Sequence, residues 1–287
     1  MKKTLLFSAR VSAVALLFLT IYSCETQKNP SEDKNEPAKA LCEPITEKDG
    51  IHTLKTACQF EEVMTEISQS KNSLFVFDID NTLLITNDNK FGSDWWYSQT
   101  KKDSTLKLNV DGACLFDVLT PVFYAMFDTK PVFDGQPKSM ESLETGSNKI
   151  IACTSRGYSK SVGTSTDLEL AENSFDFMRG DTMDISNNVV MRNDIIYTKG
   201  NNKGDALLVY LEKHPYDHVF YFDDSDFKVL NVQEAFKKAN KKVALYHLEI
   251  APKIPYTEKE KTYMKEKLCN VIETLKGIEA DNCNCQN

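Results

Sequence analysis

Two short apolar runs in the sequence each end on a pair of carboxylates. Asp78 and Asp80 come directly after residues 74–77, and Asp223 and Asp224 follow a second run of the same kind. Uninterrupted apolar residues, many of them aromatic or β-branched, are typical of a strand that is buried on both faces. Carboxylates at the end of such a strand cost free energy to desolvate unless a cation shares them. The two pairs therefore predict a cation-binding site.

Hydroxyl and cationic side chains follow two further apolar runs. Thr154 and Arg156 come at the end of the run at 150–153, and Lys203 lies in the turn after the next run. Lys199, in the same turn, is an alternative to Lys203. Ligands of open α/β sheets bind at the carboxyl ends of the strands, so we expect these groups to lie beside the aspartates.

The elements that must position these residues alternate between strands and helices along the chain. The predicted strands span residues 74–77, 150–154, 194–198, 219–224 and 243–248, and the predicted helices span residues 51–70, 168–178, 205–214, 229–239 and 257–278. Such alternation is the signature of a parallel sheet with helices on both faces. The sequence therefore predicts an α/β, Rossmann-like fold.

The segment between the first two predicted strands has a different pattern. Residues 85–148 show no strong strand periodicity, whereas apolar residues over 115–127 fit a helix that Pro121 should kink or break. We interpret the segment as a small, mostly helical cap over the end of the first strand. Trp95 and Trp96, the only tryptophans, are either the core of this cap or a surface that stacks on the substrate.

The first 24 residues resemble a bacterial export signal. Two lysines follow the initiator methionine, and residues 11–22 are apolar but too short for a comfortable membrane span. The sequence Ile-Tyr-Ser-Cys that ends at Cys24 resembles a lipobox, in which the cysteine is lipidated and becomes the mature N-terminus. We therefore predict a protein of the bacterial cell envelope with a lipid anchor in the membrane. A cleaved signal peptide, which would leave a periplasmic or secreted protein, is the alternative.

Residues 25–50 are rich in Lys, Glu, Asn, Ser and Pro and are predicted to form a disordered tether.

The composition of the whole chain argues against one class of partner. The net charge is −8 and no basic run with interleaved aromatic residues occurs, so nucleic acid is not a predicted partner. An acidic protein can still bind phosphate esters if a metal ion and a few fixed cations lie in the site.

Eight cysteines in an exported chain raise the question of disulfides. If Cys24 is lipidated, an odd number is left, and these cannot all pair within one chain. They are Cys42, Cys58, Cys114, Cys153, Cys269, Cys283 and Cys285. Cys153 lies in an apolar run and is predicted to be a packed thiol. The connectivity of the others stays open.

Taken together, the motif Asp78-Ile79-Asp80-Asn81-Thr82 and the later Thr, Lys and Asp residues resemble the haloacid dehalogenase-like (HAD) phosphohydrolases. The resemblance covers residues 73–248 in the order of that family. It implies a core domain of residues 51–84 and 149–287 with the cap of residues 85–148 inserted. It also implies a phosphatase that acts on a small phosphorylated substrate.

The resemblance assigns a role to each matching residue. Asp78 would be the nucleophile that forms an aspartyl-phosphate, and Asp80 would be the general acid and base. Thr154 would hydrogen-bond the transferred phosphoryl group, while Lys203 would neutralise its charge.

The same resemblance implies Mg²⁺ as the cofactor. The metal would be held by Asp78, by the backbone carbonyl of Asp80, and by Asp224 or Asp223. The sequence does not decide which of the last two is the direct ligand. Substrate contacts are predicted for the residues next to the motifs, namely Asn81, Ser155 and Arg156. A surface salt bridge is an equally good interpretation of Arg156.

Two subgroups of the superfamily share these motifs. One is a group of uncharacterised exported bacterial HAD-like proteins with a Ser-Asp-x-Trp stretch like residues 93–96. The other is the class B acid phosphatases, whose fourth motif is matched by residues 224–226 but not by Phe227 and Lys228. A class B-like acid phosphatase or nucleotidase is therefore an alternative. So is a catalytically silent HAD-like module that only binds a partner.

Overall fold

The structure is a computed structural model that describes residues 42–88, 91–93, 95–96, 109–110, 120–176, 180, 182–186, 188–252, 254–275 and 283–284. The export signal and lipobox predicted for residues 1–24, and most of the predicted tether, lie outside these ranges and stay predictions. Among the described residues, the model contains no helix with the length and apolar character that a membrane span requires.

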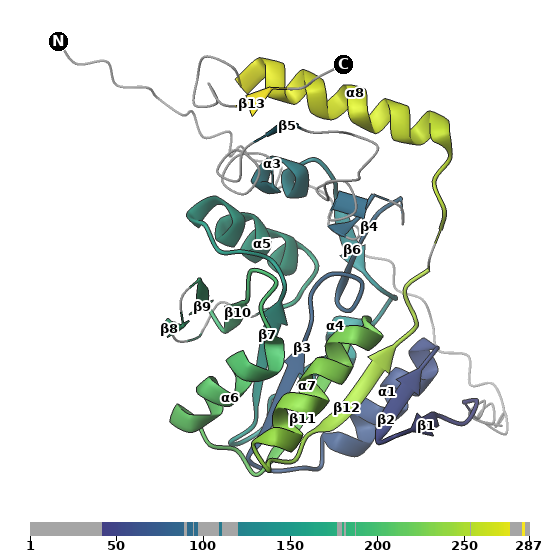
Figure 1. Ribbon diagram of the computed structural model, residues 1–287. Helices are drawn as coiled ribbons and strands as arrows, with labels where there is room; N and C mark the ends of the chain where they lie inside the picture. Colours follow the sequence, from purple (N-terminus) through teal and green to yellow (C-terminus); the bar gives the residue numbers. More distant parts are fainter. Residues whose placement is uncertain are drawn as a thin grey trace, which may run out of the picture. The chain divides into compact units, whose positions relative to one another are not determined.

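In the described part of the chain, a nine-stranded sheet forms the centre of the domain (Figure 1). Its strand order is β1-β2-β12-β11-β3-β7-β10-β9-β8. The strands from β2 to β10 in this order are parallel, whereas β1 at one edge and β9 and β8 at the other are antiparallel. In that order they span Thr46–Lys48, Ile51–Leu54, Ala244–Leu248, His218–Asp223, Ser73–Phe77, Lys149–Thr154, Ile195–Tyr197, Val189–Arg192 and Met183–Ser186. The predicted α/β fold is confirmed.

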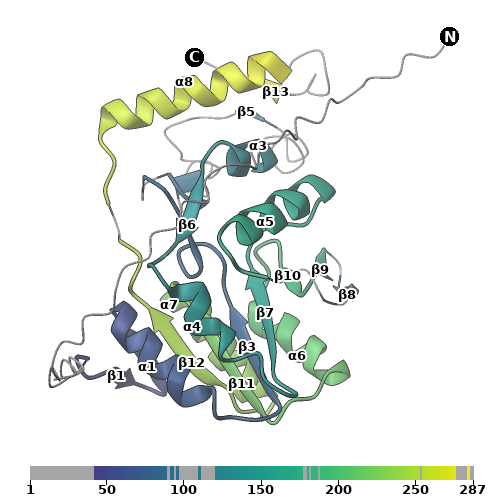
Figure 2. The same cartoon turned by 180° about the vertical axis from the view of Figure 1, so that it is seen from behind.

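Helices cover both faces of the sheet (Figure 1, Figure 2). On one face lie α1, α4 and α5, and on the other lie α6 and α7. These helices span Ala57–Ile67, Gln136–Glu141, Lys160–Glu172, Lys203–Lys213 and Asp226–Lys238. Alternate residues of β3 belong to the two cores: Phe75 and Phe77 pack in the first, and Leu74 and Val76 in the second. Because both faces are buried, the strand is apolar at every position.

The domain begins earlier than the sequence predicted. The prediction of a helix over residues 51–70 is wrong in its first part, because Ile51–Leu54 forms β2 and pairs with β12. The strand β3 is therefore the third strand of the chain, not the first. Helix α1 starts after Thr56, whose side chain accepts a hydrogen bond from Gln59 N while the Gln59 side chain accepts one from Thr56 N. This reciprocal capping box defines the helix start.

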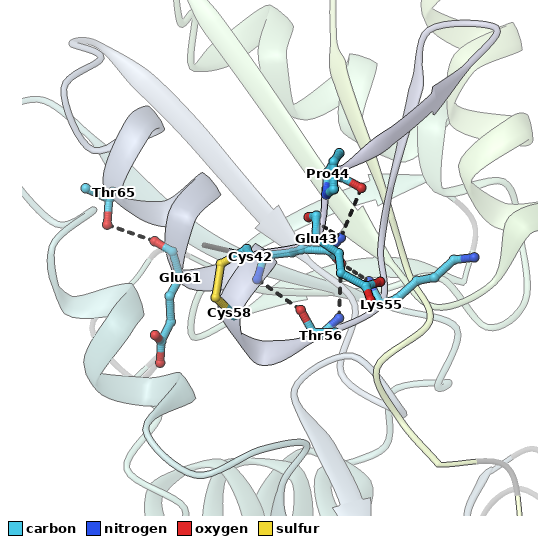
Figure 3. The surroundings of a disulfide bond; sticks show 9 residues. Cys42, Glu43, Pro44, Lys55, Thr56, Cys58, Glu61 and Thr65 are labelled. Atoms are coloured by element: carbon cyan, nitrogen blue, oxygen red, sulfur yellow. Dashed lines mark hydrogen bonds between the residues drawn. A yellow bond between two sulfur atoms is a disulfide. The ribbon is translucent and has the colours of Figure 1, made fainter. Parts of the chain in front are cut away.

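A disulfide also belongs to this early part of the domain (Figure 3). It joins Cys42, just before β1, to Cys58 in the first turn of α1. The ordered chain therefore reaches back to Cys42, and the predicted tether of residues 25–50 is too long at its C-terminal end. Cys153 is fully buried, and burial raises the pKa of its thiol to about 12. It is a packed thiol, as predicted.

The described part of the cap contains strands as well as a helix. β4 (Leu84–Thr86) and β6 (Thr129–Pro131) pair antiparallel, and α3 (Thr120–Ala125) precedes β6. Pro121 is the second residue of α3, where its missing N–H removes no intrahelical bond, so it does not break this helix. Leu115, Val118 and Leu119 lie outside the described residues.

The C-terminal boundary of the cap differs from the prediction at residue 148. Helix α4 packs against α1, and Met140 and Leu143 belong to the first core. Residues from about Gln136 onward are therefore part of the central domain, and the cap ends near Pro131.

The chain after β12 leaves the sheet and covers the cap. Tyr256 stacks on Phe91 with ring centroids 5.9 Å apart, and Lys267 Nζ lies 5.6 Å from the centroid of the Phe127 ring. Helix α8 (Glu258–Leu275) follows, and β13 (Cys283–Asn284) pairs antiparallel with β5 (Asn109–Val110) of the cap. The segment after β12 thus adds a second layer to the cap.

Candidate active site

The aspartates come together because β3 and β11 are neighbours in the sheet. Along the chain, β3, β7 and β10 are added in one direction, whereas β11 and β12 lie on the other side of β3. Such a reversal leaves a crevice at the carboxyl ends of the strands, which is where α/β sheets bind ligands. Phe77 pairs in register with Phe222, so Asp78, which follows β3, and Asp223, the last residue of β11, lie at the same level.

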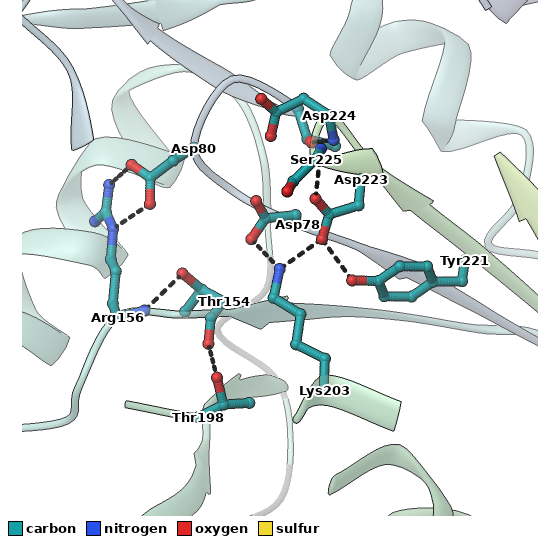
Figure 4. A network of polar contacts seen from close by, with 11 residues as sticks. Asp78, Asp80, Thr154, Arg156, Thr198, Lys203, Tyr221, Asp223, Asp224 and Ser225 are labelled. Carbon is teal, nitrogen blue, oxygen red and sulfur yellow. Dashed lines mark hydrogen bonds and ion pairs between the residues drawn. The ribbon is translucent and has the colours of Figure 1, made fainter. Parts of the chain in front are cut away.

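Lys203 lies between these two carboxylates (Figure 4). Its Nζ is 2.6 Å from Asp78 Oδ1 and 2.7 Å from Asp223 Oδ2. Burial alone would lower the pKa of Lys203, but attraction to Asp223 and Asp78 outweighs it and raises the pKa. Lys203 is the first residue of α6, which is capped by the Asn202 side chain, whereas Lys199 is exposed. The buried cation of the site is therefore Lys203.

The carboxyl group of Asp78 is in an unfavourable place for a charge. The residue is only 7% exposed. Burial raises its pKa; Lys203 offsets part of this effect, while Asp223 and Asp80 add to it, and the result is about 7. One ammonium group therefore does not hold Asp78 fully ionised at neutral pH. A second cation at the site would do so.

The side chains around Asp78 fit such a cation. One carboxylate oxygen from each of Asp78, Asp223 and Asp224 lies within 4.8 Å of the others. An all-oxygen donor set of this kind suits Mg²⁺, which needs few protein ligands because it keeps several waters. Asp80 does not contribute its carboxylate to this cluster, and the predicted metal contact through its backbone carbonyl stays a prediction.

The hydrogen bonds of the two neighbouring aspartates distinguish their roles. Asp223 Oδ2 accepts hydrogen bonds from Lys203 and from the Tyr221 hydroxyl, and Asp223 Oδ1 accepts one from the Ser225 amide at 2.9 Å. Both oxygens of Asp223 are thus engaged by the protein. The Asp224 amide donates to Thr82 Oγ1 at 3.0 Å, and Asp224 is less buried than Asp223 and so more open to a hydrated ion. Of the two, Asp224 is the better candidate for the direct metal ligand.

Asp80 is held by Arg156 rather than by the metal cluster (Figure 4). Arg156 Nε donates to Asp80 Oδ2 at 3.1 Å, and its NH2 group donates to Asp80 Oδ1 at 2.8 Å. The other terminal nitrogen donates to Thr166 and Glu169 on α5, at 2.9 and 2.8 Å. The guanidinium carbon lies 3.9 Å from the centroid of the Tyr124 ring on α3. Arg156 therefore fixes the orientation of Asp80 by a bidentate pair and is itself fixed from the central domain and the cap.

This position bears on the predicted substrate role of Arg156. The residue is 2% exposed and does not line the cavity beside Asp78. The two interpretations left open by the sequence were a substrate contact and a surface salt bridge. The structure places Arg156 in a buried salt bridge.

The remaining predicted residues lie at the same edge of the sheet. Thr154 is fully buried at the end of β7, and its Oγ1 accepts a hydrogen bond from the Arg156 amide at 3.1 Å. Ser155 lines the cavity beside Asp78. Asn81 has a φ of 61° and lines a different cavity, under the cap. Its left-handed backbone turns the chain sharply after Asp80, a conformation that asparagine tolerates better than most residues.

The cavity beside Asp78 has a volume of about 360 Å³. Lys228 lines it together with Lys203 and Asp78, although the sequence analysis had treated Lys228 only as a departure from a motif. This lysine is half-buried, and burial together with the charge of Lys203 lowers its pKa. The signal that could have revealed it is spacing: Lys228 lies one helical turn after Asp224, at the start of α7.

The fold and this strand-edge site define a single α/β domain with an acidic, lysine-containing site at the carboxyl end of a parallel sheet. A family model described as "Protein of unknown function (DUF2608)" matches residues 56–272 of the chain, and the protein belongs to that family. The match begins at Thr56, the N-cap residue of α1, and ends within α8, so it contains every residue of the candidate site. No curated protein and no solved structure matches the chain.

Proposed function

We propose that this protein is a Mg²⁺-dependent phosphohydrolase of the HAD type that works through an aspartyl-phosphate on Asp78. The observation that carries the proposal is the arrangement of Asp78 against the Lys203 ammonium on one side and Asp224 on the other. Phosphoryl transfer depends mainly on positioning and on the stabilisation of charge. A nucleophilic carboxylate, a buried fixed cation and a cluster of oxygen ligands supply those needs within one cavity.

In this proposal, the first step is attack of an Asp78 oxygen on phosphorus. A bond forms between that oxygen and phosphorus, and the bond from phosphorus to the ester oxygen breaks. Asp80 must enter this step protonated, with one of its hydrogen bonds from Arg156 given up. It then gives its proton to the departing oxygen, so the products of the step are the free alcohol and the phosphorylated Asp78. Lys203 stabilises the negative charge on the transferred group. Lys228, on the wall of the same cavity, provides a second positive charge.

In the second step, water attacks the phosphorus of the acyl phosphate. Asp80, now ionised, takes a proton from the water, and the bond between phosphorus and Asp78 breaks to release inorganic phosphate. The residues that would hold Mg²⁺ are Asp78 and Asp224. Asp223 holds the Lys203 ammonium group in place through their ion pair. When bound, the ion would neutralise phosphoryl oxygens and keep Asp78 ionised.

The position of Arg156 fits a supporting role in the second step, because a neighbouring cation favours the ionised form of Asp80 that acts as the base. A general base must also be directed at one atom of the attacking water. The bidentate pair with Arg156 limits the rotation of the Asp80 carboxylate, and Glu169 balances the second half of the guanidinium charge. We therefore assign Arg156 as a positioning residue for Asp80.

The proposal is tested with the chain from Cys42 onward and a panel of phosphate monoesters, assayed with Mg²⁺ and with chelator. Hydrolysis should require Mg²⁺ and should be lost in Asp78→Asn, because an amide is not a nucleophile for this reaction. Asp226→Asn, at an exposed acid near the site, is the matched control and should retain activity. A wild-type protein that binds Mg²⁺ and cleaves no ester on a broad panel would instead support the binding-module alternative. A strong preference for nucleotides would favour the class B-like alternative.

A further inference from the structure

A second, larger cavity adjoins the candidate active site. It has a volume of about 480 Å³, within the range of small-molecule sites. One wall comes from the cap, including Ile85 and Trp95. The other comes from the end of β12 and the segment after it, including Leu248, Ile254 and Tyr256. We call this cavity the cap groove.

The cap groove has two apolar walls, and its polar residues are Asn81, Thr86, Asp224 and Lys261. Besides the five residues that define its walls, Ala251, Pro252 and Pro255 contribute to the lining. The cation of the groove, Lys261, has its Nζ 2.5 Å from Glu258 Oε1 in an exposed ion pair at the start of α8. The walls meet in an aromatic contact, because the rings of Trp95 and Tyr256 are 6.5 Å apart in an edge arrangement. This lining favours an uncharged, apolar ligand.

The cap groove and the active-site cavity share one lining residue. Asp224 lines both cavities. Asn81, which follows the proposed general acid Asp80 in the chain, lies on the groove side. An ester whose phosphate occupies the cavity beside Asp78 would therefore direct its organic part past Asp224 and Asn81 into the groove.

We propose that the cap groove binds the organic part of the substrate, and that this part is an apolar group of the size of one or two aromatic rings. The inference rests on the proposed phosphohydrolase function and adds the class of substrate. Binding would bury the apolar surface of the group against Ile85, Trp95 and Ile254, which is the favourable term. A small polar ester would gain nothing from these walls and would bind through its phosphate alone.

A charged residue in the groove should separate the two classes of ester. Ile254 is 40% exposed, so Ile254→Lys should fold normally while it places an ammonium group in the apolar wall. Leu230 is also 40% exposed, lies on α7 outside the groove, and provides the control Leu230→Lys. The substrates are naphthyl phosphate, which fills the groove, and phosphoserine, which does not.

We expect Ile254→Lys to raise the KM for naphthyl phosphate by roughly tenfold or more, the cost of placing a charge against an apolar ligand. The kcat for phosphoserine and its KM should stay within about twofold, and Leu230→Lys should change neither substrate. Equal effects of Ile254→Lys on both esters, or no effect on either, would overturn the groove assignment.

Binding of naphthol, the alcohol without its phosphate, separates this inference from the proposed function. Calorimetry should detect naphthol binding to the wild type and a loss of that binding in Ile254→Lys. If naphthol binds in this pattern but no ester is hydrolysed, the groove is a ligand site and the phosphohydrolase proposal fails. If esters are hydrolysed but naphthol does not bind, the groove inference fails alone.

Discussion

The burial of Asp78 predicts an unusual dependence of stability on pH. In the metal-free folded protein the pKa of this carboxyl is raised by burial from 3.8 to about 7. The unfolded chain therefore loses the proton near pH 4, whereas the folded chain keeps it until about pH 7. A raised folded pKa contributes stability at low pH that is lost as the pH rises through the folded value.

The size of the effect follows from the same values. The difference between 3.8 and about 7 corresponds to about 4 kcal/mol in the free energy of unfolding over the full range. About 2–3 kcal/mol of this falls between pH 5 and pH 8. Asp78→Asn has no carboxyl to ionise and is close in size, so it lacks this contribution. The wild type should lose stability relative to Asp78→Asn as the pH rises.

The assay is urea unfolding of both proteins in chelator at a series of pH values. The free energy of unfolding of the wild type minus that of Asp78→Asn should fall by about 2–3 kcal/mol from pH 5 to pH 8. Saturating Mg²⁺ should remove most of this fall in stability. The ion binds only the folded state and would keep Asp78 ionised there, so it stabilises the protein at the pH values where the ionised Asp78 is otherwise unfavourable. Parallel curves for the two proteins in chelator would refute the reasoning. So would a difference that grows with pH.

Three further predictions concern residues around the site and at the N-terminus. Arg156→Lys should lower kcat by about 10- to 100-fold with little change in KM, because a charge-assisted hydrogen bond to Asp80 is lost. An unchanged pH profile and an unchanged kcat would contradict a positioning role. Lys228→Met should raise the KM for phosphate esters by about five- to tenfold, because one cationic contact is lost. Lys237 is an exposed lysine on the same helix, and Lys237→Met should leave the KM unchanged. Equal KM values for the two variants would remove Lys228 from the site. Cys24→Ala should move the full-length protein from the membrane fraction to the soluble fraction and abolish lipid labelling; membrane attachment that persists would count against the lipobox.

The sequence predicted the central sheet well because its strands are buried on both faces. The runs before Asp78, Thr154 and Asp223 are continuous apolar segments, and the structure places them at β3, β7 and β11. The predicted helices at 205–214 and 229–239 correspond to α6 and α7 within a few residues. Such segments carry a strong local signal, since every position faces a core.

The errors lie where the local signal is weak or the deciding contact is distant. β2 was interpreted as the start of a helix because Leu54 continues the near-helical spacing of Cys58, Val63 and Ile67. Its identity as a strand depends on pairing with β12, far along the chain. Helix α5 was predicted at 168–178 but spans Lys160–Glu172, since Ser159 caps it and its apolar face is interrupted by Thr166. The end of the cap was placed too late because nothing local shows that α4 packs on α1.

The site shows the same division. Residue type and order indicated Asp78, Asp80, Thr154 and Lys203 as a group at one sheet edge, because each follows a strand. The partner of Arg156 could not be derived in this way, since its pair with Asp80 joins residues 76 positions apart. The engagement of both Asp223 oxygens by the protein depends likewise on the fold.

The most direct test of the central claim is to look for the phosphorylated residue itself. Wild type, Asp80→Asn and Asp78→Asn are mixed with nitrophenyl phosphate and Mg²⁺, quenched in acid, digested and analysed by mass spectrometry. Asp80→Asn should accumulate the acyl phosphate, because a good leaving group needs no acid while hydrolysis needs the base. The account predicts one added phosphoryl group on the peptide that contains Asp78 and none in Asp78→Asn. Turnover by Asp78→Asn, or a phosphoryl group on any other residue, would contradict it.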